Sequence, residues 1–255
     1  MELTPSAAGL AGAVGFVSGV LSGMFGIGGG ILTTPAVRLV LGAPALIAVG
    51  TPLPVILPGA LTGALSYVRR GLADVRSGVL LGACGVVPSV AGAWFTTRVG
   101  GTVVLVATAG LILWAAFDTT SQVLKRPDAA APGPDRPVDA APSAPAGPRP
   151  VTVALTGVLA GAYSGFFGLG GGFVIVPLLT RFGRMPVKRA IGTSLVAVTL
   201  LAVPGTIAHA RLGHVDWFMA LALSVGVVPG ALLGARLTAR ARDSRSRRQS
   251  GSANT

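Results

Sequence analysis

The chain has 255 residues, of which 51% are hydrophobic and only 11% charged, whereas soluble domains usually carry about 25% charged residues. Its charges lie in short islands between long uncharged runs, which is typical of a multi-pass membrane protein and excludes a soluble enzyme with one large core. The net charge of +12 comes from arginines that flank apolar segments or gather in the tail, so it indicates membrane topology and not nucleic-acid binding.

The first apolar unit, residues 9–41, is interrupted by a run of glycines between Gly26 and Gly30. One straight helix of this length would reach roughly 50 Å, against a hydrocarbon core of about 30 Å. Each glycine also costs a helix about 1 kcal/mol relative to alanine. The unit is therefore predicted to be a helix, a glycine break and a second half-helix. Lipid cannot bond the freed backbone groups, so the break must face protein or water.

Three further apolar segments follow in the first half, at residues 43–68, 77–97 and 102–117. The first contains four prolines, which membrane helices tolerate where neighbouring groups bond the freed carbonyls. The second carries small residues at a spacing suited to close helix contact. These residues are Gly78, Gly82, Gly85, Ser89 and Gly92.

Residues 119–150 differ in kind, because they are rich in proline and alanine with scattered charges. They are predicted to be a disordered or polyproline-like linker outside the bilayer. The apolar pattern then restarts at residues 151–182, 186–210 and 216–237. From residue 240 the chain is rich in arginine and serine, which predicts a basic disordered tail with no counterpart of the fourth segment.

The second half repeats the first at a fixed offset of 142 residues. The offset carries Pro35 to Pro177 and Asp74 to Asp216, and many other positions coincide in the same way. Internal duplication explains these coincidences. The predicted organisation is a first membrane repeat (7–118), a linker (119–150), a second membrane repeat that lacks its last helix (151–239) and the tail (240–255).

The positive charges distinguish two topologies. If each broken unit crossed the membrane fully, the Lys and Arg residues would divide 8 against 12 between the two sides. If each is instead a re-entrant hairpin, only Arg38, Arg98 and Arg211 lie on one face, and the other 17 of the 20 lie on the opposite face. The positive-inside rule favours the hairpins. The expected fold is thus all-α, with two homologous helical repeats that are inverted relative to each other.

The glycine breaks are the candidate binding site. The run has no following Lys-Ser/Thr and no surrounding strand–helix pattern, which excludes a Walker A loop and a dinucleotide fingerprint. A half-helix that begins after the glycines presents free N–H groups and a positive dipole end, which bind anions. The alternative is tight packing by small residues, and each nearby hydroxyl could instead bond its own helix. The predicted substrate-binding residues are Ser22, Gly26, Gly28, Gly29, Gly30, Thr51, Ser164, Gly168, Gly170, Gly171, Gly172, Thr193 and Ser194.

Few ionisable residues lie near the spans. Asp74 and Asp216 are expected to cap the helices that follow them. His209 is expected to lie at the membrane interface, with titration in a proton-coupled cycle as the alternative. No carboxylate pair, nucleophile–base constellation or metal-ligand cluster occurs within the spans, so we expect no enzyme activity, no catalytic residue, no metal and no cofactor.

The two glycine motifs resemble those of the sulfite exporter TauE/SafE family of bacterial membrane permeases. The resemblance is carried by Gly23-Met-Phe-Gly26-Ile-Gly28-Gly-Gly30 with Pro35, by Gly165-Phe-Phe-Gly168-Leu-Gly170-Gly-Gly172 with Pro177, and by Arg189-Ala-Ile-Gly192-Thr193-Ser194. It implies an inner-membrane permease for small anions such as sulfite, sulfoacetate or other organosulfonates. We expect alternating access, with protons as a candidate coupling ion. A passive anion channel and a non-transporting scaffold or assembly factor remain the alternatives.

Overall fold

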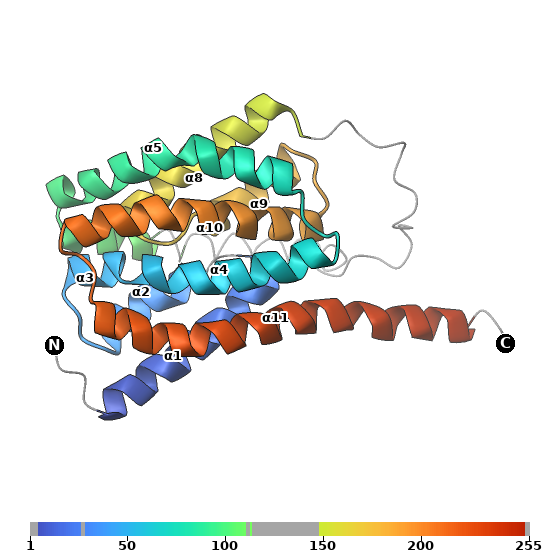
Figure 1. Ribbon diagram of the computed structural model, residues 1–255, viewed down its shortest axis with the longest axis horizontal. Helices are drawn as coiled ribbons and strands as arrows, with labels where there is room; N and C mark the ends of the chain where they lie inside the picture. Colours follow the sequence, from blue (N-terminus) through green and yellow to red (C-terminus); the bar gives the residue numbers. More distant parts are fainter. Residues whose placement is uncertain (1–4, 27–28, 111–112, 114–147, 253–255) are drawn as a thin grey trace.

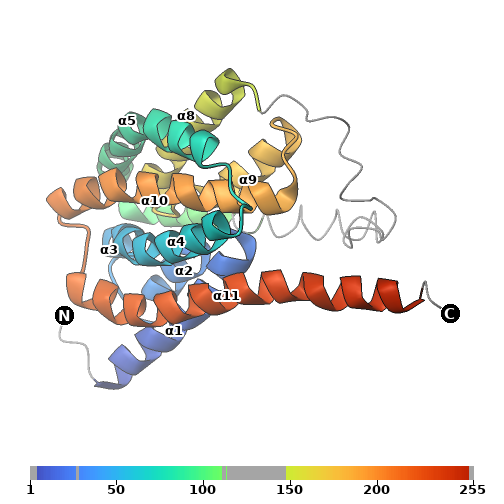
Figure 2. The same ribbon diagram turned by 45° about the vertical axis from the view of Figure 1, so that its right-hand side comes forward.

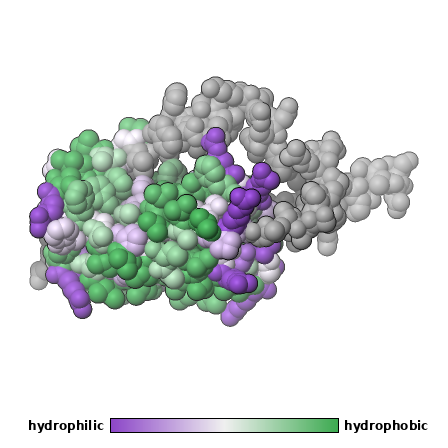
Figure 3. All heavy atoms as spheres, turned by 90° about the horizontal axis from the view of Figure 1, so that it is seen from above, coloured by the Kyte–Doolittle hydropathy of each residue, from purple (hydrophilic) through white to green (hydrophobic). Residues whose placement is uncertain are grey.

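A computed structural model of the protein describes residues 5–26, 29–110, 113 and 148–252, with side chains between residues 8 and 237. These residues form α-helices and turns and contain no strand (Figure 1). Six of the helices are long and apolar enough to cross a membrane. Apolar side chains form a belt between two hydrophilic ends (Figure 3), which confirms the prediction of an all-α integral membrane protein.

The helices of the first half are α1 (Pro5–Phe25), α2 (Gly30–Leu39), α3 (Ala45–Gly50), α4 (Pro52–Arg69), α5 (Val75–Val99) and the short apolar helix Gly101–Gly110. Those of the second half are α8 (Pro150–Phe167), α9 (Gly172–Arg181), α10 (Val187–Arg211) and α11 (Trp217–Ser252). Both glycine runs separate two helices, so the predicted breaks are confirmed. The predicted linker lies outside the described residues up to residue 147.

The second segment differs between the halves for a local reason. Helices α3 and α4 are separated at Thr51, whereas α10 is continuous through Thr193. Pro52 follows Thr51 and has no backbone N–H to bond the preceding turn, while the residue after Thr193 is a serine. The interruption between α3 and α4 is therefore explained by one proline.

The first membrane-length helix of each half packs against the third membrane-length helix of the other half. Helix α1 lies along α11, and α8 lies along α5 (Figures 1 and 2). Glycine has no Cβ atom, and the point where one would lie is called its Cβ position. The Cβ position of Gly15 meets the Leu223 carbonyl, and that of Gly23 meets the Ala231 carbonyl, so α1 and α11 run in the same direction. Only glycine allows these backbones to approach so closely, as in other membrane helix pairs.

Helix α5 uses its predicted small residues in the same way. The Cβ position of Gly157 on α8 meets the Leu81 carbonyl, and that of Gly165 meets the Ser89 carbonyl, so α5 and α8 are also parallel. On another face of α5, Gly78 lies against Val196 of α10. The predicted close contact through this helix is therefore confirmed.

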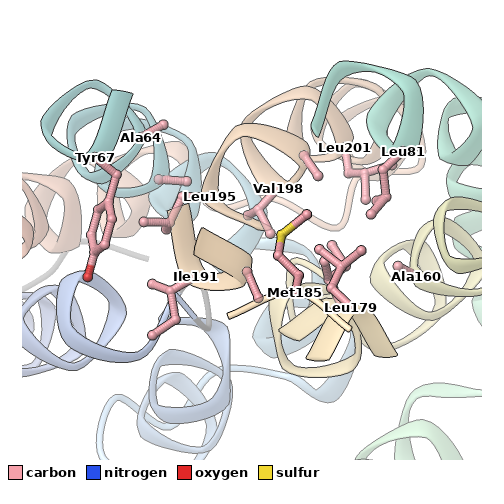
Figure 4. Close-up of a cluster of buried hydrophobic side chains, with 14 of the residues drawn as sticks. Ala64, Tyr67, Leu81, Ala160, Leu179, Met185, Ile191, Leu195, Val198 and Leu201 are labelled. Carbon is pink, nitrogen blue, oxygen red and sulfur yellow. The ribbon is translucent and has the colours of Figure 1, made fainter. Parts of the chain in front are cut away.

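Helices α4 and α10 are adjacent and antiparallel, because Gly63 meets Leu195 while Gly205 meets Leu53. A buried apolar cluster lies around this pair, and Figure 4 shows part of it, including Val198. In Figure 1, α1, α4 and α11 run from left to right, and α5, α8 and α10 run from right to left. These opposite directions agree with inverted halves, although the duplication itself stays a prediction.

Helix α11 continues beyond the other helices of the bundle (Figure 1). Its backbone is helical through Ser252, whereas the sequence predicts a disordered tail from residue 240. Arginine has a high helix propensity, so a helix that leaves the membrane can continue through an arginine-rich stretch.

Candidate functional site

The two glycine breaks have the same backbone geometry. Gly29 precedes α2 with φ 79°, and Gly171 precedes α9 with φ 73°. L-residues with a side chain rarely adopt this left-handed conformation, whereas glycine adopts it readily. The glycines therefore turn the chain sharply enough for a half-helix to begin beside the end of the preceding helix.

The two breaks meet inside the bundle. The Cβ position of Gly30 lies 2.7 Å from the Cα atom of Leu169, which belongs to the other break and is fully buried. The Cβ position of Gly170 lies 3.0 Å from a methyl carbon of Ile56 and 3.5 Å from one of Val198. These two residues lie near the middle of the 25-residue spans Ala45–Arg69 and Val187–Arg211. The site is thus close to the midplane.

Helices α2 and α9 each have 10 residues, or about 15 Å, which is half the hydrocarbon thickness. They begin at the glycine breaks and end in the loops before α3 and α10. Each half-helix therefore directs its N-terminus, the positive end of its dipole, toward the middle of the bundle.

Each break is held by the opposite half. The Ser194 hydroxyl lies 3.1 Å from the Gly26 carbonyl and 2.8 Å from the Ile191 carbonyl, and it donates its hydrogen to these acceptors. The Cβ position of Gly168 meets the Val49 carbonyl on α3. The structure therefore brings Ser194 to the first break, but its hydroxyl is engaged with the backbone.

Ser22 and Ser164 have a different environment. Their side chains are 1% and 0% exposed, and neither hydroxyl has a hydrogen-bond partner. The Ser22 Cβ lies 3.6 Å from the Cβ position of Gly29, and the Ser164 Cβ lies 3.4 Å from that of Gly171. A buried hydroxyl without a partner costs stability, so two of them beside the N-caps of both half-helices require an explanation.

The first turn of α9 also has free donors. The Gly171 carbonyl accepts from the N–H groups of Val174 and Ile175. The N–H groups of Gly172 and Phe173 have no partner among the described residues, as expected of a helix N-terminus without a side-chain cap. These two donors lie at the N-terminus of α9, next to Gly171, whose Cβ position is close to Ser164.

Thr51 and Thr193 connect the halves reciprocally. The Thr193 hydroxyl accepts from the N–H of Asp74 at 2.9 Å, and the Thr51 hydroxyl accepts from the N–H of Asp216 at 3.1 Å. Both aspartates cap the helices that follow them, through the N–H groups of residues 77 and 219, so the capping interpretation is confirmed. Asp74 also forms an ion pair with Arg189, at 3.6 Å.

The sequence identified part of this arrangement. Residues of both breaks lie in contact, whereas their role in substrate binding stays a prediction, and Gly28 lies outside the described residues. Ser18 and Thr34 were not included in the predicted set, yet their hydroxyls are also buried beside or within the first broken unit and have no partner. Their positions at the offset of 142 are Ala160 and Val176, so the repeat gave no signal for them.

His209 is fully buried, and the expectation of an interfacial histidine is wrong. Its Nε2 atom lies 2.8 Å from the Gly165 carbonyl on α8. Close packing of α10 against neighbouring helices removes the side chain from the interface even though it lies near the end of its helix.

Comparison with known proteins agrees with this architecture. Residues 11–250 match the family model described as "Sulfite exporter TauE/SafE". A "Probable membrane transporter protein" of Xylella fastidiosa (strain 9a5c) is 32% identical over 91% of this chain and 84% of its own length. The "Probable membrane transporter protein YunE" of Bacillus subtilis (strain 168) is 28% identical over 89% of this chain and 85% of its own. No solved structure matches this chain.

The family match covers nearly the whole chain, and the first of these relatives exceeds 30% identity along most of its length. The six membrane-length helices agree with a multi-pass membrane protein. The chain therefore belongs to the sulfite exporter TauE/SafE family and is a multi-pass transporter of the cell membrane.

Proposed function

We propose that the protein is a permease for small anions, most specifically sulfur oxyanions or organosulfonates such as sulfite or sulfoacetate, and that it binds them between the two glycine breaks. The observation that carries the proposal is the contact between the breaks, each of which has a buried, unpartnered serine hydroxyl beside a half-helix N-terminus. The substrate class itself follows from the family resemblance.

Backbone groups can bind an anion here without a buried cation. Among the described residues, no lysine or arginine side chain is buried. The N–H groups of Gly172 and Phe173, the hydroxyls of Ser22 and Ser164, and two dipole ends supply donors and positive potential in a low-dielectric interior. A fixed lysine would hold a permanently charged solute more tightly, whereas neutral donors favour release as well as binding.

Alternating access is the proposed mechanism. The central antiparallel pair α4 and α10 lies between two sets of helices that run in opposite directions. Thr51 at the start of α4 bonds the loop before α11, and Thr193 on α10 bonds the loop before α5, so one such hydrogen bond joins the central pair to each set. A rocking movement about α4 and α10 would open the breaks first to one side and then to the other.

Charge gives the proposed orientation. Arg38, Arg98 and Arg211 lie at the end of the bundle where α10 finishes and α11 begins. The other basic residues whose side chains are described lie at the opposite end: Arg69, Arg70, Arg76, Arg149, Arg181, Arg184, Lys188, Arg189 and Arg236. By the positive-inside rule, the end with three arginines faces outside and the other faces the cytoplasm.

The test is uptake of labelled sulfite and sulfoacetate by proteoliposomes containing the wild-type protein or the Ser22→Ala and Ser164→Ala variants. A hydrogen bond to a charged group is worth about 1.5–3 kcal/mol, so each variant should raise the half-saturation concentration at least about tenfold. Thermal stability should stay unchanged or rise, because each variant removes a buried hydroxyl without a partner.

Ser224→Ala is the matched control, because the Ser224 hydroxyl bonds the Ala220 carbonyl of its own helix. It should leave half-saturation unchanged. Unchanged half-saturation in both break variants would contradict the site. Flux that does not saturate and shows no exchange across the membrane would indicate a passive channel, and absence of flux for any small anion would favour a scaffold.

A further inference from the structure

The two histidines of the chain form a pair at the outer end of α10. The Nδ1 atoms of His209 and His214 lie 3.2 Å apart, and the Nε2 atom of His209 lies 2.8 Å from the Gly165 carbonyl. Both side chains are buried. A carbonyl oxygen only accepts hydrogen bonds, so the Nε2 atom of His209 carries a hydrogen.

This geometry fixes the proton positions. In neutral His209 the Nδ1 atom has no hydrogen and accepts, so the Nδ1 atom of His214 must donate, which leaves the Nε2 atom of His214 unprotonated. One additional proton can bind there without breaking any contact. A second additional proton would place hydrogens on both of the Nδ1 atoms that face each other. The pair therefore holds one extra proton and no more.

We propose that His209 and His214 form a one-proton relay that couples proton movement to anion transport at the second break; this rests on the proposed function. A proton binds the Nε2 atom of His214, and the Nδ1 hydrogen of His214 then passes to the Nδ1 atom of His209. His214 is left neutral with its hydrogen on Nε2, and His209 becomes cationic against the Gly165 carbonyl. Gly165 lies three residues before Gly168, so the charge arrives beside the proposed anion site.

Among the described residues, neither histidine forms an ion pair with an acidic group. At the end of the bundle where the pair lies, the ionisable groups on α10, the following loop, α8 and α5 are Arg211, Asp216, Tyr163 and Arg98. Asp216 accepts from the Met219 N–H, the Tyr163 ring contacts the Phe167 ring at a tilt, and Arg98 lies over the ring of Trp94. Helix α3 presents the backbone of Gly50 to His214.

Burial without a counterion lowers the pKa of His214 below its ordinary value. At neutral pH the pair is accordingly neutral in the conformation described here. Protonation of the histidine pair costs free energy in this conformation. Proton binding therefore favours a different conformation, in which the pair is better solvated or lies against a bound anion. A cation and an anion at neighbouring positions would then bind cooperatively.

The first half contains a non-titrating counterpart of the pair. At the offset of 142, Tyr67 replaces His209, and its hydroxyl lies 3.4 Å from the Gly23 carbonyl. In Figure 4 its ring points from α4 toward α1. Leu72 replaces His214. The relay thus serves one break only, and the double variant His209→Tyr/His214→Leu rebuilds the first half's arrangement at the second break.

The proton site can be tested without any solute. The chain has only 2 histidines, so selective ¹⁵N-histidine labelling of the purified protein gives spectra of these two rings alone. We expect His209 with its hydrogen on Nε2, His214 with its hydrogen on Nδ1, and uptake of a single shared proton as pH falls. Two independent titrations, or the opposite tautomers, would overturn the relay.

Coupling is tested in proteoliposomes that contain a trapped pH dye and receive labelled sulfoacetate, whose sulfonate and carboxylate are ionised at neutral pH. Wild type should acidify the lumen in step with uptake. The double variant and His214→Gln should take up sulfoacetate without acidification of the lumen. Tyr67→Phe should take up sulfoacetate and still acidify the lumen. Persistent acidification in both histidine variants would overturn the coupling. Absence of sulfoacetate and sulfite uptake by wild type would instead refute the proposed function, and coupling with it, while the spectra would still report on the proton site.

Discussion

Replacing Gly30 with alanine tests the contact between the two breaks directly. The added methyl carbon would lie 2.7 Å from the Leu169 Cα atom and 2.8 Å from its carbonyl carbon and oxygen. The first separation is about 0.7 Å shorter than the 3.4 Å at which ordinary contact begins. Because backbone, and not a flexible side-chain end, occupies the space, one of the two breaks must shift by several tenths of an ångström.

The expected cost follows from two opposing effects. Overpacking of a buried contact costs about 1–3 kcal/mol, whereas alanine gains up to about 1 kcal/mol over glycine in a helix. We expect Gly30→Ala to lower the free energy of unfolding by about 1–2 kcal/mol. Anion uptake should fall more than this suggests, since the N-terminus of α2 is displaced from the proposed site.

Gly9→Ala is the matched control, because Gly9 is also helical and nothing lies within 4 Å of its Cβ position. Thermal unfolding of the purified proteins and uptake by proteoliposomes should be measured on the same preparations. The reasoning is refuted if Gly30→Ala is as stable and as active as Gly9→Ala, because the two breaks could not then be in backbone contact.

Three other predictions concern the packing and the loops. Thr193→Val leaves the N–H of Asp74 without its acceptor and should reduce the free energy of unfolding by about 1–3 kcal/mol, whereas Thr62→Val, which removes only a bond within its own helix, should cost less in the same denaturation assay. Gly230→Leu places a side chain against the backbone of α1 and should cost about 3 kcal/mol or more, seen as loss of monodisperse protein in detergent; a normal elution profile would contradict the α1–α11 packing. The lowered pKa of His214 means that the unfolded chain binds the proton more readily than the folded protein. The free energy of unfolding should therefore decrease as the pH is lowered below about 6.5. His214→Gln should flatten this dependence of the melting temperature, and an unchanged slope would argue against a buried neutral histidine.

The sequence by itself determined the class of protein, the positions of the two glycine breaks and the caps of two helices. Long uncharged runs specify membrane spans, because their burial in lipid depends on composition alone. The breaks at Gly26 and Gly168 could be predicted because a cluster of glycines weakens a helix wherever it occurs. The caps at Asp74 and Asp216 were also predictable from local sequence, because a cap bonds residues only three positions away.

The partner of each element was decided only by tertiary structure. No local pattern in the sequence predicts that α1 packs on α11, that Gly30 contacts Leu169, or that the Thr193 hydroxyl accepts from the Asp74 N–H. These contacts join residues more than a hundred positions apart. The pairing of His209 and His214 is close in sequence, yet its geometry depends on how α8 and α3 enclose the end of α10. Propensity acts along a few neighbouring residues, whereas the close approach of backbones depends on the complementary shapes of whole helices, and those shapes meet only in the folded bundle.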